Sequence, residues 1–365
     1  MKVVFRTDAS LQIGTGHVMR CLTLAHELRD KGAVCHFICR EHPGNLIGLI
    51  RTRGFVVTAL PGGATDFWPA LAAPVAYAHW LGCDWQIDAE QTLEFVKAIV
   101  PDWLVVDHYA IDSQWEEVLR PQTRRMMVID DLADRKHVCD LLLDQNLGRE
   151  AEDYSSKVPA ACMLLAGPPY ALLRPEFAEL RTYSLRRRQH PQVKNLLVTM
   201  GGVDSYNATS LVLEALRNSA LPEDCRITVV MGPHAPWLLR VRKLAASMPW
   251  PTSVRVGVEN MAQLMADSDL AIGAAGGTSW ERCCLGLPTL VVVLAENQRL
   301  GAQALKRTAA AILIGEIDDI EIQLPRMFET TIQDEILAQM SKAASEITDG
   351  RGLEKLSDLL RAHND

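Results

Sequence analysis

Short apolar segments alternate with longer segments of helical periodicity along most of this chain, and this alternation constrains the fold more than any other feature. Apolar runs of strand length predict buried strands, whereas apolar residues that repeat with the helical period predict amphipathic helices. The alternation is typical of a parallel sheet covered by helices on both faces. In the first half we expect strands at residues 2–6, 34–39, 54–58, 102–106, 125–129 and 140–143, and helices at residues 16–31, 43–53, 89–99 and 113–120.

A polar, arginine-rich segment separates this series from a second one. Residues 186–191 are charged and end in proline, so we interpret them as an interdomain linker whose three arginines form a solvated surface. Beyond it we expect strands at residues 194–200, 226–231, 253–256, 269–272 and 289–294, and helices at residues 206–218, 236–246, 260–266, 278–285, 298–307, 332–346 and 353–361.

A chain of 365 residues is longer than the chain that usually folds around a single hydrophobic core, which supports two domains. The expected fold class is therefore α/β, with two Rossmann-like, doubly wound parallel-sheet domains at residues 1–185 and 194–350 that face a central cleft. Residues 351–365 are expected to form a C-terminal helix that packs back on the first domain.

Composition excludes several classes of partner. The net charge of −8 argues against nucleic acid or an anionic membrane, and 48% hydrophobic with 22% charged residues is ordinary for a soluble globular protein. The nine cysteines are scattered without a Cys-x-x-Cys pair, which is typical of reduced thiols. No targeting core or membrane-length apolar stretch is present, so we expect a cytoplasmic protein.

The first candidate site follows the first strand. Gly14 and Gly16 allow a sharp turn into the first helix, and they place His17 where parallel α/β sheets bind ligands. A histidine there can act as a general base near neutral pH; the alternative is a structural hydrogen bond at the helix start. Asp8 is the first candidate for the carboxylate that orients this imidazole, and Arg20, one turn on, is expected to meet an anion or an acid.

Two further strand ends carry polar side chains toward the same edge. Asp107, His108 and Tyr109 follow the expected strand at 102–106, and Asp130 with Asp131 follows the strand at 125–129. These residues are expected to reach the same cleft.

The second candidate site lies at residues 273–281, between a strand and a helix. Gly276 and Gly277 permit close backbone approach, and the amides of Thr278 and Ser279 are expected to be free to bind a phosphate or diphosphate. Glu281 can accept hydrogen bonds from two ribose hydroxyls, or alternatively interact with the helix dipole.

The neighbouring loops supply polar groups of less certain purpose. Asn297 and Gln298 suit sugar hydroxyls, although Asn297 can instead cap a helix. In the loop 200–207, Asp204 or Ser205 is a plausible helix cap, and the loop can serve structure or ligand equally.

Several familiar cofactor and metal motifs are missing. Met19 stands where a dinucleotide fingerprint needs its third glycine, and neither a phosphate-binding Gly-x4-Gly-Lys-Ser/Thr loop nor His-Glu-x-x-His occurs. The segment Asp267-Ser268-Asp269 reads as a cap and turn. We therefore expect no cofactor and no metal.

Together these residues resemble the GT-B superfamily of nucleotide-sugar enzymes, and in particular the UDP-sugar hydrolases of pseudaminic acid biosynthesis. The resemblance covers residues 8 to about 300, and its motifs are Asp8-x4-Ile13-Gly14-x-Gly16-His17-x2-Arg20-Cys21, Trp80-Leu81-Gly82 with Asp88-Ala89, Val128-Ile129-Asp130-Asp131 with Asp144-Gln145-Asn146, Gly201-Gly202-x-Asp204, the 273–281 loop, and Asn297-Gln298.

The resemblance implies metal-independent hydrolysis of UDP-2,4-diacetamido-2,4,6-trideoxy-β-L-altropyranose with inversion at the anomeric carbon. It makes His17 the base that activates water, with Asp8 as a possible orienting carboxylate. It assigns UDP to Gly276, Gly277, Thr278, Ser279 and Glu281, and the sugar side to Gly14, Gly16, Arg20, Tyr109, Asn297 and Gln298.

Three alternatives to a hydrolase stay open. A GT-B glycosyltransferase would pass the sugar to a carbohydrate or lipid acceptor, although the apolar stretch 67–73 lacks the neighbouring basic residues expected for a membrane lipid. A non-catalytic binding module would bind UDP without turnover, and a nicotinamide dehydrogenase is a distant fourth. The sugar substituents and the oligomeric state do not follow from residue types.

Overall fold

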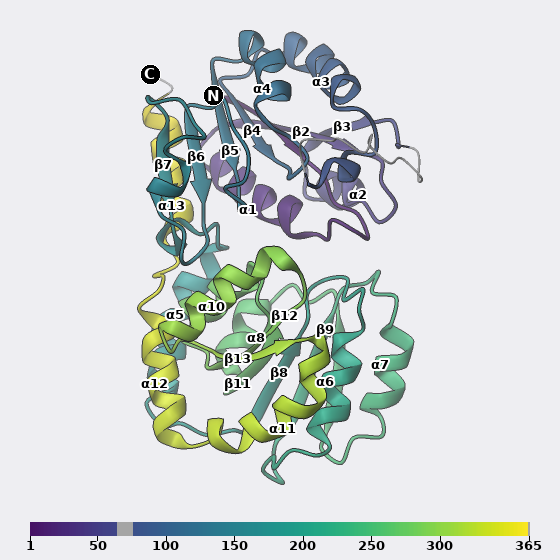
Figure 1. Ribbon diagram of the computed structural model, residues 1–365, viewed down its shortest axis with the longest axis vertical. Helices are drawn as coiled ribbons and strands as arrows, with labels where there is room; N and C mark the ends of the chain where they lie inside the picture. Colours follow the sequence, from purple (N-terminus) through teal and green to yellow (C-terminus); the bar gives the residue numbers. More distant parts are fainter. Residues whose placement is uncertain (64–75, 364–365) are drawn as a thin grey trace. The chain divides into compact units, whose positions relative to one another are not determined.

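The computed structural model describes residues 1–63 and 76–363, and its chain forms two compact units (Figure 1). The first unit comprises Met1–Leu172 and Gly352–Asp365, and the second comprises Leu173–Arg351. Residues 67–73, the apolar stretch considered above, lie outside the described residues.

The first unit is built on a parallel sheet whose strands, within the described residues, run in the order β3-β2-β1-β4-β5-β6-β7. The strands are β1 (Lys2–Thr7), β2 (Val34–Arg40), β3 (Val56–Leu60), β4 (Trp103–Asp107), β5 (Arg125–Ile129), β6 (Leu141–Asp144) and β7 (Met163–Ala166). The helices are α1 (Gly16–Asp30), α2 (Ile47–Thr52), α3 (Trp85–Ile99), α4 (Ser113–Leu119) and α13 (Gly352–Ala362), with short 3₁₀ turns η1 (Ala78–Leu81), η2 (Arg120–Gln122), η3 (Ala151–Tyr154) and η4 (Pro168–Tyr170).

Side chains along the central strands alternate between two cores, one on each face of this sheet. Val3 and Phe5 of β1 pack in the core that contains the buried residues of α1, whereas Val4 packs in the core that contains those of α3 and α4. On β4, Val105 belongs to the α1 core and Val106 to the opposite one. This period of two decides which functional side chains meet beyond the strand ends.

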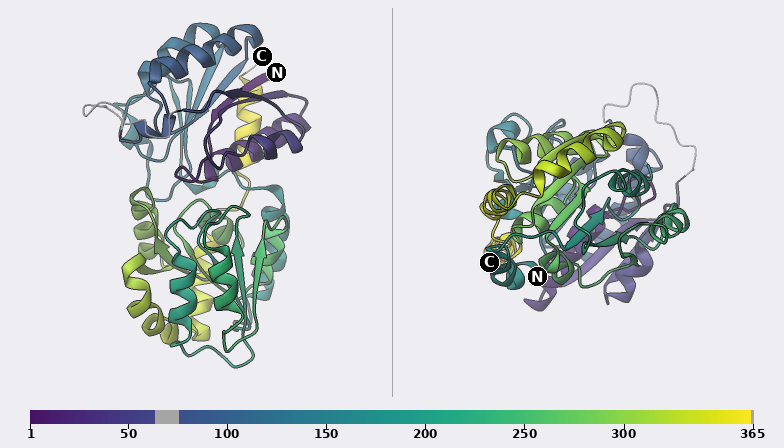
Figure 2. Two further views of the ribbon diagram at one scale, coloured as in Figure 1. Left: turned by 90° about the vertical axis from the view of Figure 1, so that its right-hand side faces the viewer. Right: turned by 90° about the horizontal axis from the view of Figure 1, so that it is seen from below.

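The helix α13 belongs to the first unit, although the whole second unit precedes it in sequence. It lies along α1, as the yellow and purple helices show in Figure 2. Leu356 is fully buried in the α1 core, and Trp103 Nε1 donates a hydrogen bond of 3.0 Å to the carbonyl of Leu360. Lys31 at the end of α1 forms an ion pair of 2.7 Å with Asp358.

The second unit is also built on a parallel sheet, in the order β10-β9-β8-β11-β12-β13 within the described residues. Its strands are β8 (Asn195–Thr199), β9 (Arg226–Met231), β10 (Thr252–Val256), β11 (Leu270–Ala274), β12 (Thr289–Val293) and β13 (Ile312–Glu316). Its helices are α5 (Pro175–Arg187), α6 (Ala208–Leu216), α7 (Leu238–Ala245), α8 (Met261–Asp267), α9 (Thr278–Cys284), α10 (Arg299–Arg307), α11 (Ile320–Thr331) and α12 (Asp334–Ser345), with 3₁₀ turns η5 (Glu296–Gln298) and η6 (Ile317–Asp319).

The units divide between Leu172 and Leu173, earlier than the linker expected at residues 186–191. The reason is that α5 packs on the second unit, where Ser184 Oγ donates to the Leu285 carbonyl at 2.7 Å. The expectation that all three arginines form a solvated surface is also wrong. Arg188 is buried and donates to the carbonyls of Leu285, Ser268 and Met265.

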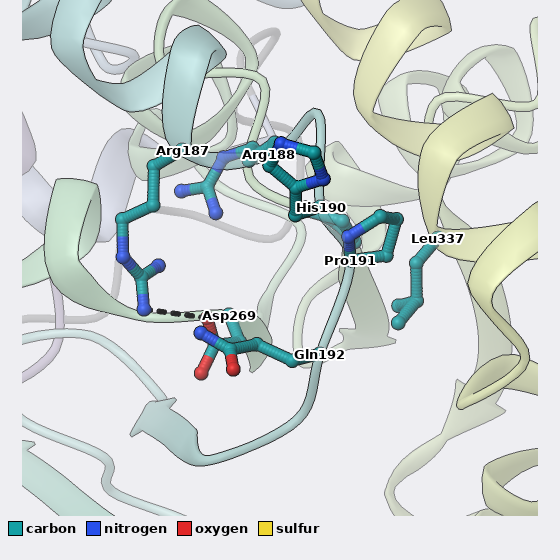
Figure 3. Close-up of a pocket in the computed structure, with 8 residues that line it drawn as sticks. Arg187, Arg188, His190, Pro191, Gln192, Asp269 and Leu337 are labelled. Carbon is teal, nitrogen blue, oxygen red and sulfur yellow. Dashed lines mark ion pairs between the residues drawn. The ribbon is translucent and has the colours of Figure 1, made fainter.

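A small pocket lies beside these arginines (Figure 3). Arg187 forms an ion pair of 2.6 Å with Asp269 across it. The residues that line it are Arg187, Arg188, His190, Pro191, Gln192, Asp269, Pro288 and Leu337, and none of them is a predicted site residue.

None of the helices in the described part of the chain is both long enough and apolar enough to span a membrane.

Candidate active site

The loop between β1 and α1 brings His17 to the first turn of α1. Ser10 organises this loop, because its Oγ accepts the amide of Ile13 at 2.9 Å and its carbonyl accepts the amide of Gly14, also at 2.9 Å. Gly14 has a φ of 81°, a conformation that favours glycine. The His17 side chain is mostly buried, with 8% of it exposed.

A carboxylate holds the His17 imidazole from the end of β4. Nδ1 of His17 lies 2.6 Å from Oδ1 of Asp107, which is fully buried. Arg20 binds both oxygens of the same carboxylate, through Nε and Nη2, each at 2.7 Å. Burial alone would raise the pKa of Asp107, but the charges of Arg20 and His17 hold it well below its ordinary value. An ionised Asp107 requires the proton on Nδ1, so the tautomer assigned to neutral His17 leaves Nε2 as a proton acceptor.

Asp8 does not orient His17, so that prediction is wrong. Its Oδ2 lies 2.8 Å from Nη1 of Arg6, and its Oδ1 accepts the amide of Arg40 at 2.6 Å. Side-chain alternation is the physical reason. Asp8 follows Arg6 by two residues and shares its face of the sheet, whereas Asp107 pairs in register with Thr7 on the face that α1 covers.

A second carboxylate extends this network to Tyr109. Asp131, which follows β5, accepts a hydrogen bond of 3.0 Å from Nη1 of Arg20 and one of 2.6 Å from the hydroxyl of Tyr109. The Tyr109 ring meets the His17 ring edge to face at 4.5 Å, and Trp80 stacks on Tyr109 at 5.5 Å. The expected neighbours Arg20 and Tyr109 therefore do lie beside His17, and Arg20 meets acids there. The stacking of Trp80 on Tyr109 is not predicted by the sequence, in which Trp80 appears only as part of the motif Trp80-Leu81-Gly82.

Asp144 at the end of β6 lies behind this network. It is fully buried and accepts hydrogen bonds from the Tyr154 hydroxyl at 2.8 Å and the Asn146 amide at 2.9 Å. Asn146 also donates to Asp131 through Nδ2 at 2.7 Å. Burial and the negative charge of Asp131 raise the pKa of Asp144 to about 7.

In the second unit, residues 275–278 connect β11 to α9 and expose backbone donors. The amide of Ser279 donates to the carbonyl of Gly276 at 2.9 Å, so the expectation that this amide is free is wrong. In the part of the chain that the structure describes, the amides of Gly276, Gly277 and Thr278 have no acceptor. The donors available to an anion thus begin two residues earlier than expected, because the first turn already closes at Ser279.

Two predicted ligand residues flank this loop. Glu281 is partly buried, and no hydrogen bond or ion pair engages its carboxylate within residues 1–63 and 76–363. Burial raises the pKa of Glu281 to about 7, against the opposing charges of Arg174 and Arg282. Gln298 lies across the loop, since a Cβ built on Gly276 would be 3.7 Å from its Nε2. Asn297 precedes it in η5.

Asp204 has a structural role. Its carboxylate caps α6 by accepting the amides of Ala208 at 2.8 Å and Thr209 at 3.0 Å. Among the described residues, no group of three or more His, Cys, Asp and Glu side chains is arranged to hold a metal ion.

The predicted residues thus form two groups, each described within its own unit. His17, Arg20 and Tyr109 gather around Asp107 in the first unit, close to the loop of Gly14 and Gly16. The second unit brings together Gly276, Gly277, Thr278, Ser279, Glu281 and Gln298.

Comparison with known proteins agrees with this architecture. Residues 195–356 match the glycosyltransferase family 28 C-terminal domain. The chain is 27% identical over 303 residues to UDP-2,4-diacetamido-2,4,6-trideoxy-β-L-altropyranose hydrolase from Campylobacter jejuni. The aligned region covers 82% of this chain and 93% of that protein. It is also 27% identical over 307 residues to the uncharacterised protein MJ1062 from Methanocaldococcus jannaschii. That match covers 82% of this chain but spans only 57% of the relative.

A solved structure shows the same fold. The crystal structure of Acinetobacter baumannii MurG matches with a TM-score of 0.68 at 16% identity, over 99% of each chain. The expected fold class is confirmed: the chain has the GT-B fold, with two Rossmann-like parallel-sheet units, and its residues 195–356 are similar to the glycosyltransferase family 28 C-terminal domain.

Proposed function

We propose that this enzyme hydrolyses a UDP-linked 2,4-diacetamido-2,4,6-trideoxy hexose of the altropyranose type, as a step of pseudaminic acid biosynthesis. The observation that carries the proposal is the contact of 2.6 Å between His17 and Asp107, which makes a general base out of a mostly buried histidine. The name of the Campylobacter relative supports the choice of substrate.

The reaction needs one base and one stabilised leaving group. Nε2 of His17 takes a proton from water while the water oxygen bonds to the anomeric carbon. The bond from that carbon to the UDP oxygen breaks, and UDP leaves with the electron pair. Attack opposite the leaving group inverts the anomeric carbon. UDP leaves readily as an anion, so the pair of carboxylic acids of ordinary glycosidases is not required.

The second unit supplies the stabilisation in this proposal. The amides of Gly276, Gly277 and Thr278 donate hydrogen bonds to the diphosphate and stabilise its growing negative charge. The carboxylate of Glu281 accepts hydrogen bonds from the two ribose hydroxyls. It is suited to this role because it has no other hydrogen-bond or ion-pair partner in the described residues. Asn297 and Gln298 bind on the sugar side, together with Gly14, Gly16, Arg20 and Tyr109.

A glycosyltransferase is the second candidate, and the match to a glycosyltransferase family over residues 195–356 favours it. In that case His17 would take its proton from an acceptor hydroxyl rather than from water. A module that binds UDP without turnover would use the second unit in the same manner and leave His17 idle.

Incubation with a panel of UDP-sugars in water, followed by ion-exchange chromatography of free UDP, separates these candidates. A hydrolase releases UDP without an acceptor, and NMR of the fresh product shows the inverted anomer. A transferase releases UDP only after a carbohydrate or lipid acceptor is added. Binding of UDP without release under either condition would indicate the non-catalytic module. The His17→Asn variant serves as the control for contaminating activity.

A further inference from the structure

Arg282 of α9 is a buried cation that interacts electrostatically with the adjacent Glu281 but forms no ion pair with it. It is 1% exposed, and in the described part of the chain no carboxylate lies within ion-pair distance of its guanidinium. Its Nε has no hydrogen-bond partner among the residues that the structure describes. A buried charge of this kind is costly, because burial removes its hydration and no anion replaces it.

Other buried arginines do not share this situation. Arg6 in the first unit is paired with both Asp8 and Asp88. Arg188, in the same unit as Arg282, donates from Nε, Nη1 and Nη2 to three carbonyls. Among these three arginines, only Arg282 combines a charge that forms no ion pair with a donor, Nε, that has no hydrogen-bond partner in the described residues.

The guanidinium of Arg282 lies directly behind the loop that carries the free amides. Nη2 donates to the carbonyl of Ala274 at 2.8 Å and to Ser279 Oγ at 3.0 Å, and Nη1 donates to Thr278 Oγ1 at 3.2 Å. A Cβ on Gly273 would lie only 2.6 Å from Nη1, so the glycine at the end of β11 makes room for the guanidinium. The positive charge and the free amides thus occupy two sides of one short loop.

The hydrogen bond from Arg282 also sets the direction of the Thr278 hydroxyl. Thr278 Oγ1 accepts from Arg282, and within residues 1–63 and 76–363 its own O–H has no acceptor. Thr278 is partly exposed, so this hydroxyl can donate to a ligand in front of the loop. The neighbouring charge strengthens such a donor, as in other charge-assisted networks.

We propose that Arg282 is a positioning residue for the nucleotide diphosphate: it supplies the buried counter-charge behind the 275–278 loop and directs the Thr278 hydroxyl toward the phosphate. The inference rests on the proposed function, because it assumes that this loop binds a UDP-linked substrate. Arg282 does not touch the nucleotide. It acts through the loop and through the electric field of its charge, which is little screened at a buried position.

The test compares ligands with and without phosphate. Calorimetric titration with UDP and ligand-observed NMR titration with uridine are carried out on the wild type, Arg282→Gln and Arg282→Lys. We expect Arg282→Gln to weaken UDP binding by about 10- to 100-fold while uridine affinity stays unchanged. Arg282→Lys retains the charge and should recover part of the UDP affinity. Inorganic pyrophosphate should displace UDP from the wild type.

The matched control is a second buried arginine of the same unit, Arg188. Arg188→Gln removes another buried arginine of the same unit, and it should leave the ratio of UDP to uridine affinity unchanged. Equal UDP affinity in wild type and Arg282→Gln, or an equal loss of UDP and uridine binding, would overturn this inference alone. Failure of the wild type to bind UDP would overturn the proposed function as well. If Arg282→Gln does not fold, Thr278→Val decides, because it removes the hydroxyl that Arg282 is proposed to direct toward the phosphate; wild-type UDP affinity in that variant would contradict the proposal.

Discussion

Nδ1 of His17 lies 2.6 Å from Oδ1 of Asp107, and the same carboxylate is bound on both oxygens by Arg20. Arg20 therefore fixes the carboxylate, and the carboxylate fixes the imidazole. The arrangement favours a proton on Nδ1 of His17, so Nε2 is the ring nitrogen to which we assign the base role in the proposed function.

Replacement of His17 by asparagine should reduce turnover by about 10²- to 10⁴-fold, because the base that deprotonates water is lost. UDP affinity should remain within a factor of about two, since UDP is assigned to the second unit and a change below that factor is under about 0.5 kcal/mol. Measurement of UDP release and UDP binding on the same preparation checks both. His26→Asn, on the same helix, is the control; normal turnover in folded His17→Asn would remove His17 from the base role.

Replacement of Asp107 by asparagine should lower kcat by about 10²- to 10⁴-fold with little change in KM, because the wrong tautomer of His17 is then favoured. Asp8→Asn provides the contrast. It breaks a buried ion pair with Arg6 and should cost about 3 kcal/mol of stability, while kcat per folded molecule stays near the wild-type value. Thermal melts and steady-state kinetics distinguish the two effects. A greater loss of kcat in Asp8→Asn would restore Asp8 as the orienting carboxylate.

Uridine affinity should rise about tenfold from pH 6 to pH 8, because the pKa of Glu281 is raised to about 7 and only the ionised carboxylate accepts both ribose hydroxyls. Uridine is the better probe, since it lacks a phosphate that titrates in the same range. In Glu281→Gln the affinity should be lower and independent of pH. Ligand-observed NMR at the two pH values gives the comparison, and a flat wild-type profile would contradict the ribose assignment.

The first unit should lose stability as pH rises toward neutrality because of Asp144, whose pKa is raised from 3.8 to about 7. The folded state keeps the proton over a range in which the unfolded state has released it. Stability is therefore complete below pH 3.8 and falls until about pH 7. Asp144→Asn removes this dependence, so its stability relative to wild type should improve by about 2 kcal/mol between pH 5 and pH 8. Thermal melts at both pH values test this, with exposed Glu117→Gln as control; a constant difference would contradict it.

Much of the fold follows from the apolar periodicity, but four elements were not predicted. The strand β7 is a wholly apolar run of four residues and is no shorter than the predicted β6, so its pattern was present in the sequence and was missed. The strand β13 contains Gly315 and a register irregularity, which interrupt its apolar run. The helix α11 holds Pro325 in its interior, which hides the helical pattern. The helix α5 is mostly polar, since only Phe177 and Ser184 are fully buried, and no helix was expected there; only its last two residues, Arg186 and Arg187, fall within the linker expected at residues 186–191.

In the candidate site, too, some residues can be predicted from the local sequence, whereas others depend on contacts between distant parts of the chain. The glycine loops, His17 and Glu281 are visible in the sequence because each follows a strand. The partner of His17 depends on strand order, since β4 rather than β2 brings its carboxylate to the α1 face. Counting the alternation along β1 and β4 would have favoured Asp107 over Asp8, because odd-numbered residues of both strands face α1. No sequence pattern marks Arg282, because its burial without an ion pair among the described residues is a property of the packed unit.

The return of α13 to α1 sets an order for folding during synthesis. The second unit is continuous in sequence, whereas the first unit needs residues 352–363, which are synthesised after all of the second unit. Until those residues emerge, the apolar surface of α1 that receives Leu353, Leu356 and Leu360 stays uncovered. The unit that carries His17 is therefore completed only when α13 is added, and a chain truncated before Gly352 would leave the apolar core of that unit open while every strand of the second unit is present.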